Sequence, residues 1–401
     1  KTGDEQLPSN TMSTIITNIF PGRYIQGPNA FKTLPEEIKR FGPRCIALLC
    51  PFSTKVILPT IKQPLHAALD LFDATEFNNE CTDEEIDRLV QLANTHKPNV
   101  LLGMGGGKAL DTIKCVADKM GLPCIMCPTM ASTDAPCSAL SIVYTADGAV
   151  KRIQYHRKNP DVVIVDSVTV SKAPVRMIVA GMGDALATWF EAESCKIKNA
   201  PNSTNSGRPG SLTAYALARL CYDTLLEWGV QAKCAVEAQT VTPALEKIIE
   251  ANTLLSGLGF ESAGLAAAHA IHNGLTQLPQ THHNVHGEKV AIGLQASLFL
   301  TGKGQEIVDE VYTFCEAIGL PTQLNDIGLR EVTDDELMIV AKRSLEPGDS
   351  MINEPYPIDA EAIVRAMRMA DHYGKARKHG LLSKQVSTQL HTRKFVQLHC
   401  H

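Results

Sequence analysis

The chain has 401 residues, a formal net charge of −5, and 44% hydrophobic and 20% charged residues. At roughly 100–200 residues per domain this length indicates two or three domains, and the ordinary composition excludes a wholly disordered chain. The mild acidic balance gives no support for a nucleic-acid or anionic-lipid surface, and no apolar run approaches the ~20 residues that a membrane helix needs.

The cysteines point to a reducing compartment, because the twelve are scattered along the chain and several lie in apolar runs. Cys124-x-x-Cys127 has the spacing of a redox or zinc pair, but it lies in a strand-like run without a second pair, which favours buried thiols. The chain begins at Lys1, and residues 1–16 contain no apolar core of a signal peptide. We therefore expect an intracellular location, in the cytoplasm or a mitochondrion.

Residues 17–174 alternate short apolar runs with helical patterns. Apolar runs without polar alternation are typical of parallel strands buried on both faces. Between two of these runs, Leu110, Ile113 and Val116 recur at helical spacing, which gives the order strand, helix, strand. This part predicts an α/β domain with a parallel sheet and flanking helices. The predicted strands are Cys45–Cys50, Asn99–Gly103, Pro123–Cys127 and Asp161–Asp166.

Residues 175–401 carry few strand signals and many Ala-rich stretches at helical spacing, which predicts an all-helical second domain. The predicted helices are Asp184–Cys195, Leu212–Trp228, Ala244–Leu255, Ser262–Asn273 and Gly287–Leu300, with a loop at Asn199–Ser211. A cleft between domains is the usual place for a small-molecule site, so we expect the active site between the two halves.

The first candidate site is the turn Gly103-Met104-Gly105-Gly106-Gly107-Lys108, which follows a predicted strand and opens a helix. Glycines let backbone N–H groups approach a phosphate, and the helix N-terminus adds a favourable dipole. The Walker A pattern fails at Leu102, and G-x-G-x-x-G fails because Lys108 replaces its last glycine. The turn predicts pyrophosphate binding, with a tight turn that binds no ligand as the alternative.

The second candidate site is the segment Pro128–Pro136, which contains small hydroxyl residues directly after the next strand. Ligands bind beyond the carboxyl ends of strands in open α/β sheets. Hydroxyl groups there can hold phosphate or the nicotinamide ribose, and Asp134 can accept a hydrogen bond from a substrate hydroxyl. The alternative is an ordinary turn in which Asp134 caps a helix.

The third candidate site is a histidine cluster, because five of the 13 His lie between His269 and His286. His269 and His272 are three residues apart on an Ala-rich helix and share one face. Gly274 favours a helix end, and a short loop returns His286 to the start of another helix. Two helices that meet in this way can direct imidazoles at one divalent metal.

A carboxylate would complete such a metal site, and Asp184 at a predicted helix start is the candidate. Asp184 could instead stabilise that helix start through the dipole. For the histidines, the alternative is solvated loop residues at His282 and His283 and packed helix residues elsewhere.

Six ordered segments carry a family resemblance. They are GGGKALDT (105–112), PTMASTDAPCSALSIVY (128–144), KNPDVVIVD (158–166), GMGDALATWFEA (181–192), GFESAGLAAAHAIHNGL (259–275) and HGEKVAIG (286–293). From about Ile19 to Gly374 the chain resembles the glycerol dehydrogenase branch of the iron-containing alcohol dehydrogenase family.

The resemblance implies a dinucleotide-binding α/β domain, an all-helical domain, and oxidation of glycerol to dihydroxyacetone with NAD and zinc. It implies Asp184, His269 and His286 as metal ligands and Asp134 as the partner of a substrate hydroxyl. It further implies a homo-oligomer, an octamer. The implied cofactor contacts are Gly105, Gly106, Gly107, Lys108, Asp111, Thr129, Ser132, Ser138, Leu140 and Tyr144.

Two positions depart from the family pattern. Thr188 stands where many relatives in the wider family place a His four residues after the ligand Asp, which favours zinc over iron. Cys50-Pro51-Phe52-Ser53 follows the first predicted strand without the Asp that often binds the adenosine ribose, so NAD rather than NADP is expected from the family alone. His272 could relay a proton or could be a second-sphere or packing residue.

Other functions stay open. One is another polyol or alcohol dehydrogenase, or a dehydroquinate-synthase-like enzyme, on the same fold. A phosphorylated substrate would need a cluster of Lys or Arg near the metal, and residues 259–290 contain no such cluster. The other is a nucleotide-binding regulator with structural zinc, although such zinc sites usually contain Cys and none flanks these histidines.

Overall fold

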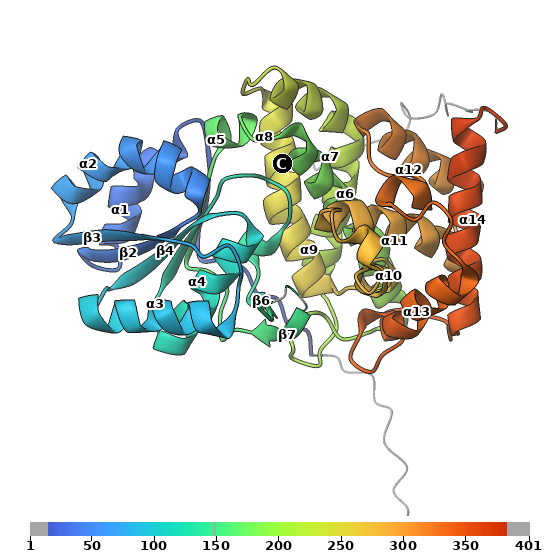
Figure 1. The fold of residues 1–401 in the computed structure, drawn as a ribbon, viewed down its shortest axis with the longest axis horizontal. Helices are drawn as coiled ribbons and strands as arrows, with labels where there is room; N and C mark the ends of the chain where they lie inside the picture. The colour runs from blue at the N-terminus through green and yellow to red at the C-terminus, as the bar shows by residue number, and fades with distance from the viewer. Residues whose placement is uncertain (1–14, 147, 149, 383–401) are drawn as a thin grey trace, which may run out of the picture.

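The structure is a computed structural model that describes residues 15–146, 148 and 150–382. One half is a sheet with helices on both faces, and the other half is helical (Figure 1). The sheet has six parallel strands in the order β1-β8-β5-β4-β2-β3. These strands are β1 (Tyr24–Gly27), β2 (Arg44–Leu49), β3 (Leu71–Glu76), β4 (Val100–Gly105), β5 (Cys124–Pro128) and β8 (Val162–Asp166). The predicted fold class is confirmed.

The strands are apolar throughout because both faces of the sheet are covered. On β2, Cys45 and Ala47 belong to the core beneath α1 (Leu34–Lys39) and α2 (Leu58–Ala68). Ile46 and Leu48 point to the other face, which is covered by α3 (Asp83–His96) and α4 (Gly107–Met120). Figure 1 shows these helix pairs on opposite sides of the sheet.

The strand register brings the two predicted ligand loops to one edge of the sheet. Gly103 pairs with Met126 and Gly105 with Pro128, so β4 and β5 end side by side. After β5, the loop runs through a short 3-10 helix, η3 (Ala135–Cys137), into an antiparallel hairpin of β6 (Leu140–Tyr144) and β7 (Val150–Tyr155). The sequence analysis did not predict this hairpin.

After β8, α5 (Ser167–Ser171) leads into the helical half. The long helix α6 packs against both α7 and α11. The helices are α6 (Val175–Lys198), α7 (Leu212–Glu237), α8 (Pro243–Glu250), α9 (Ser256–Ala263), α10 (Ala267–Leu275), α11 (His286–Leu300), α12 (Gln305–Ile318), α13 (Asp334–Ser344) and α14 (Ala360–Lys378), with a π-helical turn, η4 (Ala251–Leu255), between α8 and α9.

Two predicted helices need correction. The stretch Ser262–Asn273 is not one helix, because α9 ends at Gly264, whose φ of +119° is a conformation that helices do not contain. The helix predicted to begin at Asp184 begins at Val175, directly after Pro174. Asp184 is therefore inside α6 and does not stabilise a helix start. The predicted loop Asn199–Ser211 does separate α6 from α7.

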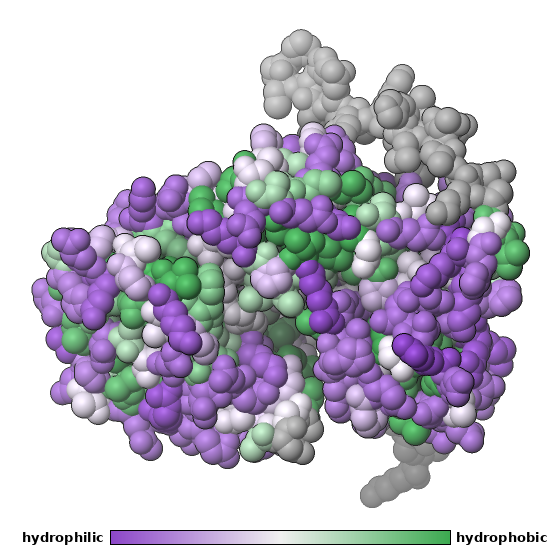
Figure 2. All heavy atoms as spheres, turned by 45° about the horizontal axis from the view of Figure 1, so that its top comes forward, coloured by the Kyte–Doolittle hydropathy of each residue, from purple (hydrophilic) through white to green (hydrophobic). Residues whose placement is uncertain are grey.

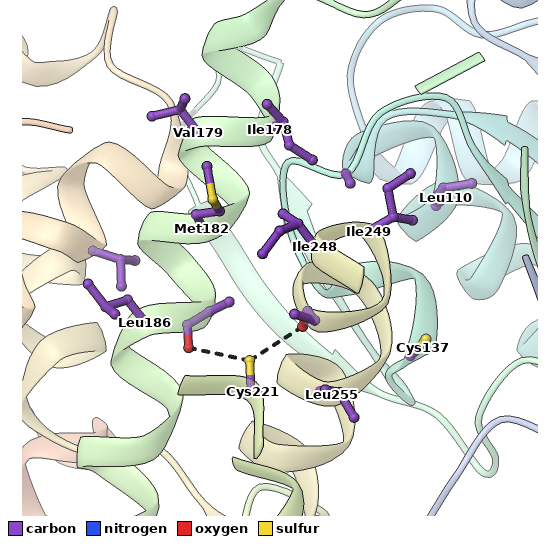
Figure 3. Close-up of a cluster of buried hydrophobic side chains, with 14 of the residues drawn as sticks. Leu110, Cys137, Ile178, Val179, Met182, Leu186, Cys221, Ile248, Ile249 and Leu255 are labelled. Carbon is purple, nitrogen blue, oxygen red and sulfur yellow. Dashed lines mark hydrogen bonds between the residues drawn. The ribbon is translucent and has the colours of Figure 1, made fainter. Parts of the chain in front are cut away.

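The two halves share one hydrophobic core. Leu110 of α4 and Cys137 of the loop after β5 lie in the same cluster as Met182 of α6 and Ile249 of α8 (Figure 3). In that view the Cys221 thiol lies 3.7 Å from the carbonyl oxygen of Ala185 and 3.4 Å from that of Ala251. The loop after β5 is therefore packed directly against the helical half.

The described residues contain no single helix that is long and apolar enough to cross a membrane. Only the pair Pro243–Ala263 and Ala267–Leu275, bent by 103°, reaches that length and composition together.

Candidate active site

Asp184, His269 and His286 converge from three helices. Nε2 of His269 lies 3.3 Å, and Nε2 of His286 3.1 Å, from the same carboxylate oxygen, Oδ1 of Asp184. One ligand atom from each residue lies within 4.8 Å of the others. The sequence-predicted trio is therefore brought together.

Close helix packing makes this convergence possible. A Cβ on Gly287 would lie 1.8 Å from the carbonyl oxygen of Ala180, and one on Gly183 would lie 2.6 Å from that of Gly287. Because neither residue carries a side chain, the start of α11 lies directly on α6, beside Asp184. Arg176 of α6 also binds both carboxylate oxygens of Glu288, at 2.6 and 2.7 Å, which fixes the first turn of α11.

The outer hydrogen bonds orient the imidazoles toward Asp184. Nδ1 of His269 faces Oε2 of Glu191 at 2.6 Å, so Nδ1 carries the proton and Nε2 is left for a ligand bond. Nδ1 of His286 faces Nε2 of His272 at 3.0 Å. In metal sites generally, an acceptor such as a carboxylate behind a metal-binding His sets its tautomer in this way, and the His272 imidazole is placed to do the same for His286.

His272 lies behind the trio and not in it. It is buried, and its Nδ1 faces Oδ1 of Asn273 at 3.1 Å. The Asn273 amide in turn donates to Asp349, whose carboxylate pairs with Arg343 at 2.6 Å. Burial lowers the pKa of His272 well below its usual value, and the charges of His286 and Lys289 lower it further. A neutral His272 accepts from His286, so its position is that of an orienting residue.

The trio has the chemistry of a divalent-cation site. Asp184 is 1% exposed, and its second oxygen, Oδ2, is buried without a hydrogen-bond partner in the part of the chain that the structure describes. Burial acts to raise the pKa of Asp184, but His286 and His269 hold it well below its usual value. Burial likewise acts against the charged form of His269, yet Glu191 and Asp184 raise its pKa well above the usual value. Such a site attracts positive charge, and the donor set of one carboxylate and two imidazoles fits a metal.

The glycine turn separates into packing glycines and open glycines. A Cβ on Gly103 would lie 2.5 Å from Ile113, and one on Gly105 would lie 3.0 Å from both Ala109 and Cys50. At Gly106 and Gly107, by contrast, the nearest atoms to a Cβ would be 3.8 Å away. The protein itself gives no steric reason for these two glycines, whose φ values are not positive.

Gly106 and Gly107 begin α4, which has no side-chain cap and no acidic residue in its first turn. Free N–H groups and a positive helix end, kept clear of side chains, fit a pyrophosphate. Thr129 directly follows β5, the strand beside β4, and is 2% exposed. Its hydroxyl has no hydrogen-bond partner among the described residues, as expected for a group that faces a cofactor.

The other predicted cofactor contacts either border the glycine turn or are bonded to other groups of the protein. Lys108 pairs with Glu80 at 2.6 Å, and its Nζ lies 4.8 Å from the centre of the Tyr144 ring, so both residues border the turn. Asp111 is engaged by the protein: Oδ2 accepts from the backbone N–H of Ile142 at 3.0 Å, and Oδ1 pairs with Lys114 at 2.8 Å. Its direct contact with the cofactor stays a prediction.

Three further predicted contacts lie between the end of β5 and the first residue of β6. The Ser138 hydroxyl donates to the Ala135 carbonyl at 3.3 Å and is fully buried. The Leu140 carbonyl accepts from Lys114. Ser132 is partly exposed. Contact of these residues with a cofactor stays a prediction.

Asp134 lies between the two halves. It precedes η3 without capping it, and its Oδ2 accepts from the hydroxyl of Ser256 on α9 at 2.6 Å. Burial raises the pKa of Asp134 well above its usual value, and the negative charge of Asp184 raises it further. Through Ser256, Asp134 is linked to Thr188, one helical turn after Asp184 on α6. Contact of Asp134 with a substrate hydroxyl stays a prediction. In Figure 2 the surface is hollowed where the two halves meet.

Comparisons with known proteins agree with this geometry. Residues 21–167 match the family model described as iron-containing alcohol dehydrogenase. A glycerol dehydrogenase of Thermotoga maritima is 56% identical over 366 residues, which cover 91% of this chain and 99% of that protein. The chain belongs to the iron-containing alcohol dehydrogenase family. Members of this family bind a nicotinamide dinucleotide and a metal, and the trio and the glycine turn fit those two groups.

Solved structures extend the likeness to the whole fold. The glycerol dehydrogenase of Schizosaccharomyces pombe superposes with a TM-score of 0.88 at 33% identity and covers 93% of this chain and 95% of that one. A probable glycerol dehydrogenase of Sinorhizobium meliloti gives a TM-score of 0.83 at 39% identity, with 90% and 99% covered.

Sequence reasoning missed Glu191, Ser256 and Glu261. Glu191 could have been found, because Asp184, Thr188 and Glu191 recur at i, i+4 and i+7 and so share one face of an Ala-rich helix. Ser256 and Glu261 gave no local signal. Their hydrogen-bond partners, Asp134 and the backbone N–H of Ala139, lie more than 100 residues away in the chain. The histidines predicted as solvated, His282 and His283, are exposed, and Cys124 and Cys127 are buried free thiols.

Proposed function

We propose that the protein oxidises glycerol to dihydroxyacetone, transferring a hydride to NAD at a zinc site formed by Asp184, His269 and His286. The observation that carries the proposal is the convergence of this trio, with three protein ligands and a carboxylate oxygen that has no hydrogen-bond partner among the described residues. The names of the most similar proteins, glycerol dehydrogenases at 43–56% identity, support glycerol as the substrate.

Three protein ligands leave coordination open for a substrate, as a catalytic site requires and a closed structural zinc site does not. A divalent metal there would supply a Lewis acid next to the alcohol oxygen. The protein's own task is alignment. Glu191 and His272 hold the two imidazoles in their ligating tautomers, and Asp134 accepts a hydrogen bond from a hydroxyl of glycerol that the metal does not hold.

The loops that follow β4 and β5 position the cofactor. Gly106 and Gly107 leave room for its pyrophosphate at the start of α4, and the free Thr129 hydroxyl lies at the end of the adjacent strand. The loop after β5 contacts the helical half, so the ring of the nicotinamide and the substrate carbon can be held face to face.

The choice of zinc rests on Thr188, whose hydroxyl faces Ser256 and whose position carries a His in many relatives of the wider family. The choice of NAD rests on the family, because no carboxylate follows β2. We also propose a homo-oligomer, as the family resemblance implies. The mass of the protein in solution tests that part.

The activity is tested by following NADH absorbance with glycerol, NAD and added Zn²⁺. We expect glycerol-dependent NADH formation, with NADP a poorer acceptor. Binding of the metal and NAD without NADH formation from glycerol or related polyols would contradict the proposal and favour a dehydroquinate-synthase-like enzyme or a nucleotide-binding regulator.

A further inference from the structure

A chain of two hydroxyl groups links the metal-site helix to Asp134. Thr188 lies one helical turn after Asp184 on α6, and its Oγ1 is 3.0 Å from the Ser256 hydroxyl. That hydroxyl is in turn 2.6 Å from Oδ2 of Asp134. Thr188 is 1% exposed and Ser256 is fully buried, so water does not compete for either group.

The direction of these hydrogen bonds follows from their chemistry. The Ser256 hydroxyl donates its one hydrogen to Oδ2 of Asp134. The Ser256 oxygen then accepts from Thr188. Loss of the Thr188 hydroxyl would leave Ser256 free to turn, and loss of the Ser256 hydroxyl would free the carboxylate itself.

The backbone of the Asp134 loop is fixed by other residues. The Asn252 amide donates to the Ala131 carbonyl at 2.9 Å, and Lys114 donates to the Ala135 carbonyl at 2.9 Å. Glu261 accepts from the Ala139 N–H at 2.6 Å. Removal of the two hydroxyls should therefore change the orientation of the carboxylate and leave the loop in place.

Ser256 also follows η4 directly, and π-helical turns within helices are found frequently at functional sites. Gly257, next to it, lets α9 approach the loop, since a Cβ there would lie 3.0 Å from Cys137. The sequence thus forms a close contact at the point where the hydroxyl reaches Asp134.

We propose that Thr188 and Ser256 are positioning residues for polyol recognition, which hold the Asp134 carboxylate toward the substrate hydroxyl that the metal does not take. This inference rests on the proposed function, because it requires Asp134 to bind that hydroxyl. The inference gives Thr188 a role at the position where many relatives of the wider family carry a His.

The chain offers matched variants. Thr188→Val keeps the shape and removes the hydroxyl, Thr188→Ser keeps the hydroxyl, and Ser256→Ala removes the next hydroxyl. We expect Thr188→Val to lower kcat/KM for glycerol roughly 3- to 10-fold, mainly through KM, and Ser256→Ala to lower it about 10-fold. The rate with 2-propanol, which has no second hydroxyl, should stay within about twofold, and Thr188→Ser should restore glycerol use.

Ser297→Ala is the control, because this buried hydroxyl bonds only locally, to the Leu294 carbonyl. It should leave the ratio of glycerol to 2-propanol activity unchanged. In an Asp134→Ala background, Thr188→Val and Ser256→Ala should have almost no further effect on glycerol, because residues that act through one group are not additive.

The outcomes separate two claims: that Asp134 binds the second hydroxyl of glycerol, and that Thr188 and Ser256 position Asp134. If Asp134→Ala lowers activity with both alcohols equally, Asp134 does not bind the second hydroxyl, and both that part of the proposed function and this inference fail. If Asp134→Ala is selective for glycerol but Thr188→Val and Ser256→Ala are not, or if their effects add to it fully, only the positioning role is overturned.

Discussion

Nδ1 of His269 lies 2.6 Å from the carboxylate of Glu191, which stands two helical turns beyond Asp184 on the same helix. The same carboxylate also accepts from the backbone N–H groups of Ala266 and His269, both at 2.9 Å. Glu191 is 2% exposed. One helix therefore provides both a ligand carboxylate and the group that orients a second ligand.

Glu191→Gln should weaken metal binding roughly 10- to 100-fold, the usual effect of losing such a carboxylate behind a ligand His. Competition with a chelator at fixed pH measures this. Glu193→Gln is the matched control, because Glu193 lies two residues on and pairs with Lys303, away from the trio. Equal affinity in wild type and Glu191→Gln would show that Glu191 has no part in the metal site.

His286→Ala should lose the metal and the activity together, since its Nε2 faces Asp184. His283→Ala should be nearly silent, because that side chain is exposed in the loop before α11. Metal content per chain, measured alongside NADH formation, compares the two. If both substitutions remove the metal equally, the ligand set is wrong.

Gly106→Val should raise the KM for the dinucleotide at least tenfold with little loss of thermal stability. A Cβ there would meet only Met130, no closer than 3.8 Å, and the side chain would occupy the space proposed for the pyrophosphate. Gly103→Ala should instead lower the Tm and have little effect on the KM for the dinucleotide, since its Cβ would lie 2.5 Å from Ile113. Direct titration with NAD and a thermal scan check both variants; unchanged NAD affinity in Gly106→Val would move the phosphate site elsewhere.

Glu261 should make stability depend on pH. It is 1% exposed, and burial raises its pKa from 4.5 to about 7. An acid with a raised pKa in the folded state favours folding at low pH, and this contribution is lost as the pH rises from about 4.5 to about 7. The loss is on the order of 3 kcal/mol.

Glu261→Gln removes that titration, so its Tm relative to wild type should improve between pH 5 and pH 8. Thermal scans of both proteins at the two pH values give the comparison. A difference in Tm that stays constant with pH would exclude a titrating Glu261.

Local patterns predicted the fold well where burial is uniform. β2, β4, β5 and β8 were found because strands covered on both faces are apolar throughout, and the glycine turn was found because it sits between strand and helix. The β6–β7 hairpin and the break at Gly264 were missed. Val150–Tyr155 is largely exposed and polar, and a lone glycine within an Ala-rich stretch does not reveal a positive φ.

The site was predictable as a set of ligands but not as a network. Asp184, His269 and His286 were expected together from the resemblance, and the structure brings them together. The bonds from Ser256 to Asp134 and from Glu261 to Ala139 join segments 122 residues apart. Such pairs depend on how the two halves pack against each other, and local sequence patterns do not predict that packing.

The most direct test of the account is NADH formation from glycerol by a metal-stripped protein before and after one equivalent of Zn²⁺ per chain. We predict that stripping abolishes the glycerol-dependent absorbance change, that Zn²⁺ restores it, and that His286→Ala does not recover. Full activity in a preparation verified to be free of metal would contradict the central role of Asp184, His269 and His286.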